Sequence, residues 1–171
     1  MKGLAPALVT VRHASEGGDG ELTVEARTQL YRRYLELAWA IDIEIRSLEE
    51  LSEVVAETKA GKPLLVTSFH DFEKLPENEL LQEKIDAGVA AGADIVKIAA
   101  RLHSPDDIVR LVSFLESEKR VPLSVMGMGS LGTASRLLAA QSGSVLNYGF
   151  LTKANAPGQC AAEVLKQLIT P

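Results

Sequence analysis

Short apolar runs alternate with longer amphipathic stretches along this chain, and this alternation limits the fold more than any other feature. Six apolar runs have the length and composition of strands, and each is followed by an amphipathic stretch typical of a helix. The expected strands are 8–12, 41–46, 64–69, 95–100, 122–126 and 145–148. The expected helices are 23–38, 47–61, 78–91, 104–119, 133–140 and 160–169. Strict β-α alternation predicts an α/β fold with a parallel sheet and right-handed crossovers.

Such a sheet can be arranged in two ways, as a doubly wound sheet or as a (βα) barrel, and the alternation alone does not decide between them. No Gly-x-Gly-x-x-Gly follows the first expected strand, which weakens the dinucleotide-binding version of the first arrangement. Prominent polar or polarisable side chains fall at the carboxyl ends of different expected strands, namely Arg12, His70 and Met126, with a further loop after Tyr148. This distribution is typical of a barrel, in which βα loops at one rim build the site. The 171 residues are expected to form one domain, 1–171.

Local signals predict where several helices begin and end. Thr23 is expected to cap the first helix, and Ser47 the second with Glu50 at capping-box spacing. The buried stripe of the first helix is expected to be Leu30, Tyr34, Leu37 and Ala38. Further end signals are Gly61 and Gly92 at C-termini, and Ser104 with Pro105 at an N-terminus.

The expected strand 41–46 has a charged face formed by Asp42, Glu44 and Arg46, and isoleucines occupy its other face. One interpretation is an edge strand with these charges in solvent. The other is a polar layer inside a barrel, paired with Arg12 or Lys97. We favour the second because buried charges are tolerated when they are paired.

Lys97 stands in the middle of the apolar run 95–100, which is expected to be a buried strand. Burial disfavours the charged form of an amine, and a neutral amine in an apolar pocket is what imine formation with a ketone requires. The alternative is a lysine on an exposed edge strand, where this residue type is common.

Composition excludes several classes of function. The net charge of −5 makes nucleic acid an unexpected partner. No apolar run approaches the roughly 18 residues of a membrane span, and the N-terminus lacks the apolar region of a signal peptide. The single cysteine, Cys160, excludes an intrachain disulfide and suits a reducing compartment. We therefore expect a cytoplasmic protein with no membrane partner, and the three scattered histidines predict no metal site.

Six motifs in order along the chain resemble type I 3-dehydroquinate dehydratase, a Schiff-base enzyme of the shikimate pathway. They are Val9-Thr10-Val11-Arg12 with Glu16-Gly17-Gly18, Ile41-Asp42-Ile43-Glu44, Ser68-Phe69-His70-Asp71-Phe72, Gly92 to Ala99, Met126-Gly127-Met128-Gly129 through Ser135-Arg136, and Ala156-Pro157-Gly158-Gln159. The resemblance implies a parallel (βα) TIM-type barrel and the dehydration of 3-dehydroquinate to 3-dehydroshikimate. It implies no cofactor, because the protonated imine is itself the electron sink.

The resemblance also implies catalytic roles. Lys97 would form the imine with the substrate ketone. His70 would be the general base and later the general acid, since an imidazole titrates near neutrality. Glu16 would orient His70.

Substrate binding would fall to a second set of residues. Arg136 would bind the substrate carboxylate with its guanidinium. Arg12 would bind substrate hydroxyls or order the carboxylates. The remaining assignments are Met126, Met128 and Tyr148 as pocket walls, Gln159 on a lid loop, and Asn155 at the lid position where the family usually has serine.

The family begins with two further βα units, so the resemblance implies a barrel shortened at its N-terminus to about six units. Open strand edges seek partners, and we expect a homodimer or a partner chain that supplies the missing strands. Two other functions stay open at this point. One is a weak or inactive relative that binds a shikimate-pathway metabolite or acts as an interaction module, and the other is a different Schiff-base barrel such as a class I aldolase.

Overall fold

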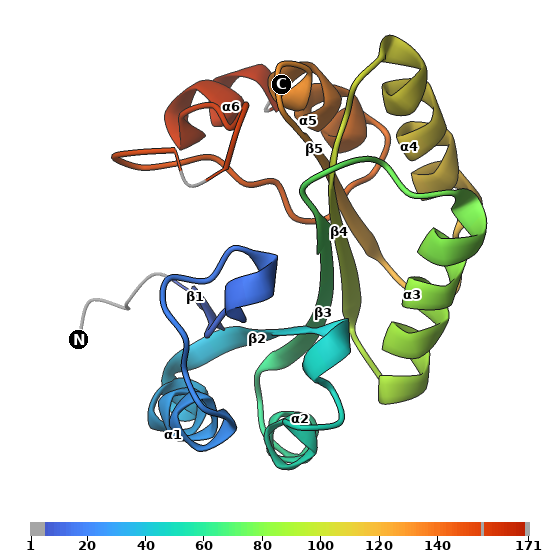
Figure 1. Ribbon diagram of the computed structural model, residues 1–171. Helices are drawn as coiled ribbons and strands as arrows, with labels where there is room; N and C mark the ends of the chain where they lie inside the picture. Colours follow the sequence, from blue (N-terminus) through green and yellow to red (C-terminus); the bar gives the residue numbers. More distant parts are fainter. Residues whose placement is uncertain (1–5, 155, 170–171) are drawn as a thin grey trace. The chain divides into compact units, whose positions relative to one another are not determined.

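The computed structural model describes residues 6–154 and 156–169, in which strands and helices alternate as expected (Figure 1). The strands are β1 (Ala7–Thr10), β2 (Ala38–Glu44), β3 (Leu64–Asp71), β4 (Ile95–Arg101) and β5 (Leu123–Met128). The α-helices are α1 (Val24–Tyr34), α2 (Ser52–Ala60), α3 (Asn78–Ala91), α4 (Pro105–Ser117), α5 (Gly132–Gln141) and α6 (Ala162–Ile169). Single 3-10 turns are η1 (Ala14–Glu16), η2 (Leu35–Leu37) and η3 (Ile45–Ser47).

The strands are hydrogen-bonded in the order β1-β2-β3-β4-β5. The β1–β2 and β2–β3 pairs are parallel, as the alternation predicts. The chain forms two compact units. The N-terminal unit runs to Phe69 and adds Lys84–Val96, and the C-terminal unit combines His70–Glu83 with the chain from Lys97 onward. The assignment of 1–171 to one domain stays a prediction.

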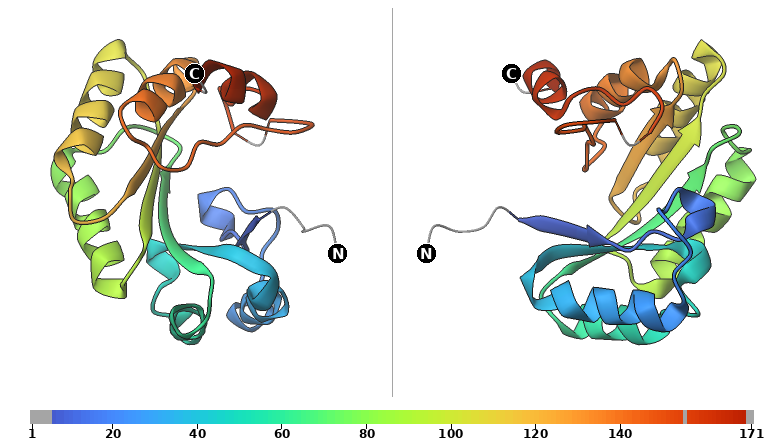
Figure 2. Two further views of the ribbon diagram at one scale, coloured as in Figure 1. Left: turned by 180° about the vertical axis from the view of Figure 1, so that it is seen from behind. Right: turned by 60° about the vertical axis from the view of Figure 1, so that its left-hand side comes forward.

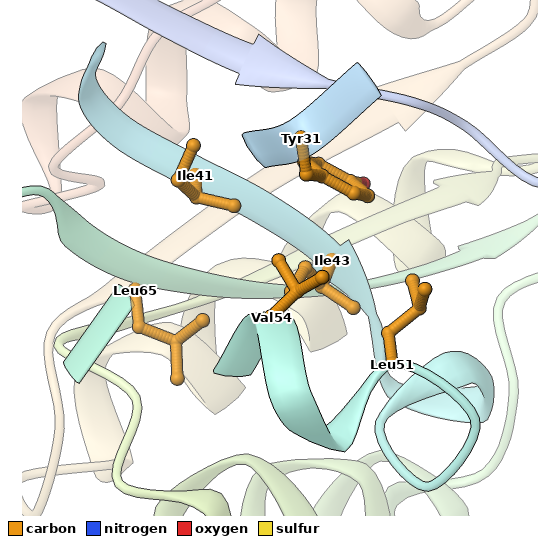
Figure 3. Close-up of a cluster of buried hydrophobic side chains, with 6 residues drawn as sticks. All are labelled: Tyr31, Ile41, Ile43, Leu51, Val54 and Leu65. Atoms are coloured by element: carbon orange, nitrogen blue, oxygen red, sulfur yellow. The ribbon is translucent and has the colours of Figure 1, made fainter. Parts of the chain in front are cut away.

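The core of the N-terminal unit lies between β2 and the helices α1 and α2, which cover the same face of that strand (Figures 1 and 2). Figure 3 shows its fully buried members, Tyr31, Ile41, Ile43, Leu51, Val54 and Leu65. Since successive side chains of a strand point to opposite faces, placing Ile41 and Ile43 in this core sends Asp42 to the other face.

The buried face of α1 differs from the expected one. The helix ends at Tyr34, and Tyr34 and Leu37 are exposed by 40% and 69%. Leu30 is only half-buried, and Ala38 belongs to β2. The buried residues are Arg27 and Tyr31, one turn apart. A buried arginine is tolerated here because its charge is paired, which the hydrophobic pattern of the helix cannot reveal.

The expected cap at Ser47 is also wrong. Ser47 ends η3, while α2 begins at Ser52 with Leu51 at the cap position. The Ser47 hydroxyl instead accepts a hydrogen bond from Arg27 Nη1 at 2.9 Å. Glu50 Oε1 accepts from the same nitrogen at 2.8 Å. Both side chains serve a buried arginine rather than a helix end.

Tyr31 provides a test of this core at high pH. Its hydroxyl donates to Asp42 O at 2.8 Å and accepts from Val11 N at 3.1 Å, and burial raises its pKa to about 12. Its contribution to stability is therefore complete below the unfolded pKa of about 10 and is lost as the pH rises through 12. We expect the free energy of unfolding to fall by about 2 to 3 kcal/mol over that range. Urea unfolding at stepped pH measures it. Tyr31→Phe should be less stable at pH 8 yet lose less stability over the same range, and equal slopes would contradict the assignment.

In the C-terminal unit α4 and α5 pack on β5, and α6 packs on α5 (Figure 2).

The expected sixth strand, 145–148, is not a strand. The backbone of this segment makes one bond to β5, from Val145 N to Leu123 O at 2.9 Å. Serine hydroxyls add further bonds: Ser124 Oγ donates to Leu146 O at 2.7 Å, and Ser144 Oγ, just before the segment, accepts from Val125 N at 3.0 Å. The apolar run is real, but side chains rather than a ladder hold it.

Candidate active site

Lys97 is the third residue of β4 and is only 6% exposed. Its ammonium nitrogen lies 4.8 Å from the centre of the Tyr148 ring, within the range of a cation–π contact. The alternative of an exposed edge strand is wrong, since β4 is not an end strand of the sheet and its residues Ile95 to Ala100 are all buried.

The pocket walls expected from the sequence gather in the same C-terminal unit. Met126 and Met128 are two residues apart on β5, so they share one face of the strand and pack with Ala99 of β4. Tyr148 and Ala156 pack against this cluster. On the opposite face of β5, Gly127 lies so close to α5 that a Cβ there would be 2.4 Å from Ser135 Oγ. This close approach brings the helix that carries Arg136 against the strand.

Arg136 is 2% exposed and makes few contacts for a buried guanidinium. Its Nη1 donates to Tyr148 O at 3.0 Å and lies 3.4 Å from the Met126 sulfur. Its Nε has no hydrogen-bond partner among the described residues, and no carboxylate there pairs with it. Burial lowers the pKa of Arg136 from its ordinary value. A buried cation of this kind suits an anionic ligand.

His70 is the next-to-last residue of β3, is half-buried, and stacks on Phe72 with ring centroids 6.5 Å apart. It belongs to the same unit as Lys97 and Arg136. Gln159, also half-buried, lies near the end of a loop whose two ends are joined by hydrogen bonds from Phe150 N to Cys160 O at 3.0 Å and from Ala162 N to Phe150 O at 2.8 Å. The predicted role of Asn155 falls on a residue outside the described ranges.

Arg12 is in the N-terminal unit, where the expected polar layer is present. Its Nη2 donates to Asp42 at 2.8 Å, and its Nη1 donates to Glu44 at 3.2 Å and Ser68 at 2.6 Å. Ser68 in turn donates to Asp42 at 2.5 Å. Burial alone would lower the pKa of Arg12, but the two carboxylates outweigh it and raise that pKa. Arg46, which was expected on the same face, lies outside β2 and is exposed.

Arg27 completes this layer, and sequence analysis missed it. Its Nη2 donates to Glu44 Oε2 at 2.5 Å, so the two oxygens of Glu44 bind two different arginines. The signal was its spacing of four residues from Tyr31 on α1, which places both on one face.

Glu16, at the end of η1, is also buried at 7% exposure, an unusual state for a carboxylate in a glycine-rich turn.

The fold and these buried cations define a parallel α/β protein in which strand β4 carries a buried amine and helix α5 a buried guanidinium. A family model described as Type I 3-dehydroquinase matches residues 2–170. The chain belongs to the type I 3-dehydroquinase family.

Individual relatives agree with this assignment. A catabolic 3-dehydroquinate dehydratase from Acinetobacter baylyi is 33% identical over 170 residues, which is 96% of this chain and 62% of the relative. A 3-dehydroquinate dehydratase from Methanocella arvoryzae is 36% identical over 162 residues, 94% of this chain and 72% of the relative. The chain thus spans less than two thirds of the Acinetobacter protein.

Solved structures extend the similarity to the fold. The 3-dehydroquinate dehydratase of Geobacillus kaustophilus matches with a TM-score of 0.88 at 29% identity, covering 96% of this chain and 66% of that one. The type I enzyme of Clostridium difficile, solved with covalently modified comenic acid, gives 0.86 at 28% identity, covering 96% and 67%. These matches confirm the expected fold class, a parallel (βα) TIM-type barrel. The roles assigned to single residues stay predictions.

Proposed function

We propose that this protein is a lyase that dehydrates 3-dehydroquinate to 3-dehydroshikimate through an imine on Lys97. The observation that carries the proposal is a buried amine in the same compact unit as a buried guanidinium that has no carboxylate partner among the described residues. Membership of the family and the names of the relatives support the substrate. They do not favour an aldolase.

The reaction would begin when the Lys97 amine adds to the substrate ketone and water leaves. Burial of Lys97 favours this step, because the nucleophile is the neutral amine. The protonated imine draws electrons from the neighbouring C–H bond, and His70 removes that proton. The same imidazolium then protonates the departing hydroxyl, and hydrolysis of the imine restores the amine.

The other predicted residues would bind and orient the ring. Arg136 would bind the carboxylate, because a guanidinium can offer two parallel N–H groups to its oxygens. Arg12 would bind hydroxyls, Glu16 would orient His70, Met126, Met128 and Tyr148 would form walls, and Gln159 would lie on a closing loop.

We also propose that the protein is cytoplasmic and that it associates with itself or with a partner chain. Within the described residues, no helix has both the length and the apolar character to cross a membrane. The strand β1 stands at one end of the described sheet order, and end strands pair readily with other chains. We propose a homodimer or a partner chain, and sedimentation that shows only a compact monomer would contradict it.

The direct test is incubation of the purified chain with 3-dehydroquinate. We expect absorbance of the conjugated enone to appear, and borohydride to trap a covalent adduct on Lys97 that is found by peptide mass analysis. Thermal stabilisation by the substrate without turnover or adduct would support a binding relative and contradict the proposal.

Arg136→Met separates binding from stability. Loss of the carboxylate contact should raise KM by about tenfold to a hundredfold, as expected for a charge-assisted hydrogen bond of about 1.5 to 3 kcal/mol. Folding should become more favourable, because an apolar side chain replaces a desolvated cation. Steady-state kinetics and thermal unfolding measure the two effects. Arg33→Met, at an exposed position of α1, is the control and should change neither KM nor stability. A destabilised Arg136→Met variant with normal KM would show a structural arginine.

A further inference from the structure

The segment Asp71–Glu77, which follows His70, is irregular after β3 ends, yet hydrogen bonds hold its backbone at many points. Asp71 Oδ1 accepts from Glu73 N at 2.8 Å and from Lys74 N at 3.0 Å. This carboxylate turns the chain directly after His70. The side chains of Phe72, Glu73 and Lys74 are exposed, whereas Leu75 and Pro76 are buried, so apolar burial holds only the later part of the segment.

Two side chains from other parts of the C-terminal unit bind carbonyl groups of this segment. His103, just beyond the end of β4, donates through Nε2 to Glu73 O at 2.6 Å. Arg110 on α4 donates from Nη1 to Pro76 O at 2.5 Å and from Nη2 to Leu75 O at 2.8 Å. We call His103 and Arg110 the loop clamp.

The loop clamp is itself fixed by Asp107. Its Oδ2 accepts from His103 N at 2.8 Å and Ser104 N at 3.1 Å, as part of the capping box of α4. Its Oδ1 lies 3.8 Å from Arg110 Nη2. Burial acts to raise the pKa of Asp107, but the two backbone hydrogen bonds and the charge of Arg110 outweigh it and lower that pKa. An ionised Asp107 therefore orients both members.

We propose that His103 and Arg110 are positioning residues that hold His70 in place relative to Lys97. The inference rests on the proposed function, in which these two residues act on one substrate. His103 continues the strand that carries Lys97, and Glu73 continues the strand that carries His70, so the bond between them joins the carboxyl ends of the two strands. Arg110 ties the same segment to α4.

The exposed residues 72–74, next to His70, bury little apolar surface, and a stretch held by such hydrogen bonds opens easily once they are removed. General acid–base catalysis needs the imidazole within hydrogen-bond reach of the proton that it moves. A misplacement of about 1 Å can lower a rate on the order of a hundredfold. The loss should therefore fall on the proton-transfer step and leave substrate binding intact.

The test compares His103→Ala and Arg110→Ala with the conservative variants His103→Gln and Arg110→Lys. We expect each alanine variant to lower kcat by about tenfold to a hundredfold with KM within about twofold of wild type. Borohydride should still trap the adduct on Lys97 at saturating substrate. His103→Gln should recover most of kcat, because its amide Nε2 can donate to the Glu73 carbonyl. Arg120→Ala removes an exposed guanidinium bound to Glu118 and should leave kcat unchanged.

Hydrogen–deuterium exchange of 71–77 gives a readout besides activity, and it should quicken in the alanine variants while β5 stays protected. Unchanged exchange, or faster exchange with unchanged kcat, would overturn the inference, as would an effect on KM alone. Should an alanine variant fail to fold, the glutamine and lysine variants decide, because Arg110→Lys keeps one donor and should give an intermediate kcat. A wild-type chain with neither turnover nor adduct would instead sink the proposed function, and the positioning role with it.

Discussion

Lys97→Met is expected to abolish dehydration of 3-dehydroquinate, lowering turnover by at least about 10⁴-fold, the scale of losing a covalent nucleophile. Methionine fills nearly the same volume in the apolar setting made by Ala99, Met126 and Met128, so the fold should be kept. The amine that would form the imine is absent, and no other described residue is assigned that role.

Two measurements check this expectation. Enone absorbance gives turnover, and borohydride with substrate should yield no adduct at position 97. Lys62→Met, which removes an exposed lysine from the connection between α2 and β3, is the matched control and should behave as wild type. Turnover of Lys97→Met near the wild-type rate, or an adduct on another lysine, would exclude the imine route proposed for Lys97.

Glu44→Gln is expected to destabilise the N-terminal unit by about 3 to 5 kcal/mol, the usual cost of breaking a buried ion pair from one side. Glu44 is fully buried, and its oxygens accept from Arg12, Arg27 and the backbone N of His13 at 2.7 Å. Glutamine removes the charge that balances both guanidinium groups. Its amide NH₂ would also face one of these donors, since only one side-chain oxygen remains.

Urea unfolding measures the effect as a lower midpoint with an unchanged m-value. Glu57→Gln is the control, because Glu57 pairs with Arg32 on the surface, where such pairs contribute little. Equal midpoints for the two variants would mean that solvent or a rearranged partner compensates at Glu44.

Local sequence signals predicted the helix ends that depend on adjacent residues. The helix α3 runs from Asn78 to Ala91 as expected, and Gly92 takes the left-handed conformation, with φ at +77°, that ends it. Ser104 and Pro105 begin α4 as expected. In each case the residues that set the boundary lie within one turn of it.

The wrong predictions, the buried face of α1 and the cap at Ser47, depend instead on contacts with residues distant in sequence. Arg27 is buried because Glu44 comes from another element, and Ser47 is drawn from its expected cap by the same arginine. In the site, the burial of Lys97 followed from its apolar neighbours, and the pairing of Arg12 with Asp42 and Glu44 followed from alternation in β2. The contribution of Ser68 could not be predicted, because a serine in an apolar strand has many ordinary explanations.

The irregular course of residues 145–148 has a consequence for the electrostatics of the site. In a regular strand the carbonyl of Tyr148 could accept a ladder hydrogen bond from a neighbouring strand, whereas here it accepts one from the Arg136 guanidinium. The ring of the same residue faces the Lys97 ammonium. One tyrosine therefore contacts both cations through different atoms. A substrate carboxylate that binds Arg136 would move the guanidinium away from the Tyr148 carbonyl and so change the surroundings of the amine as well. We therefore expect carboxylate binding at Arg136 and the reactivity of Lys97 to be coupled through Tyr148.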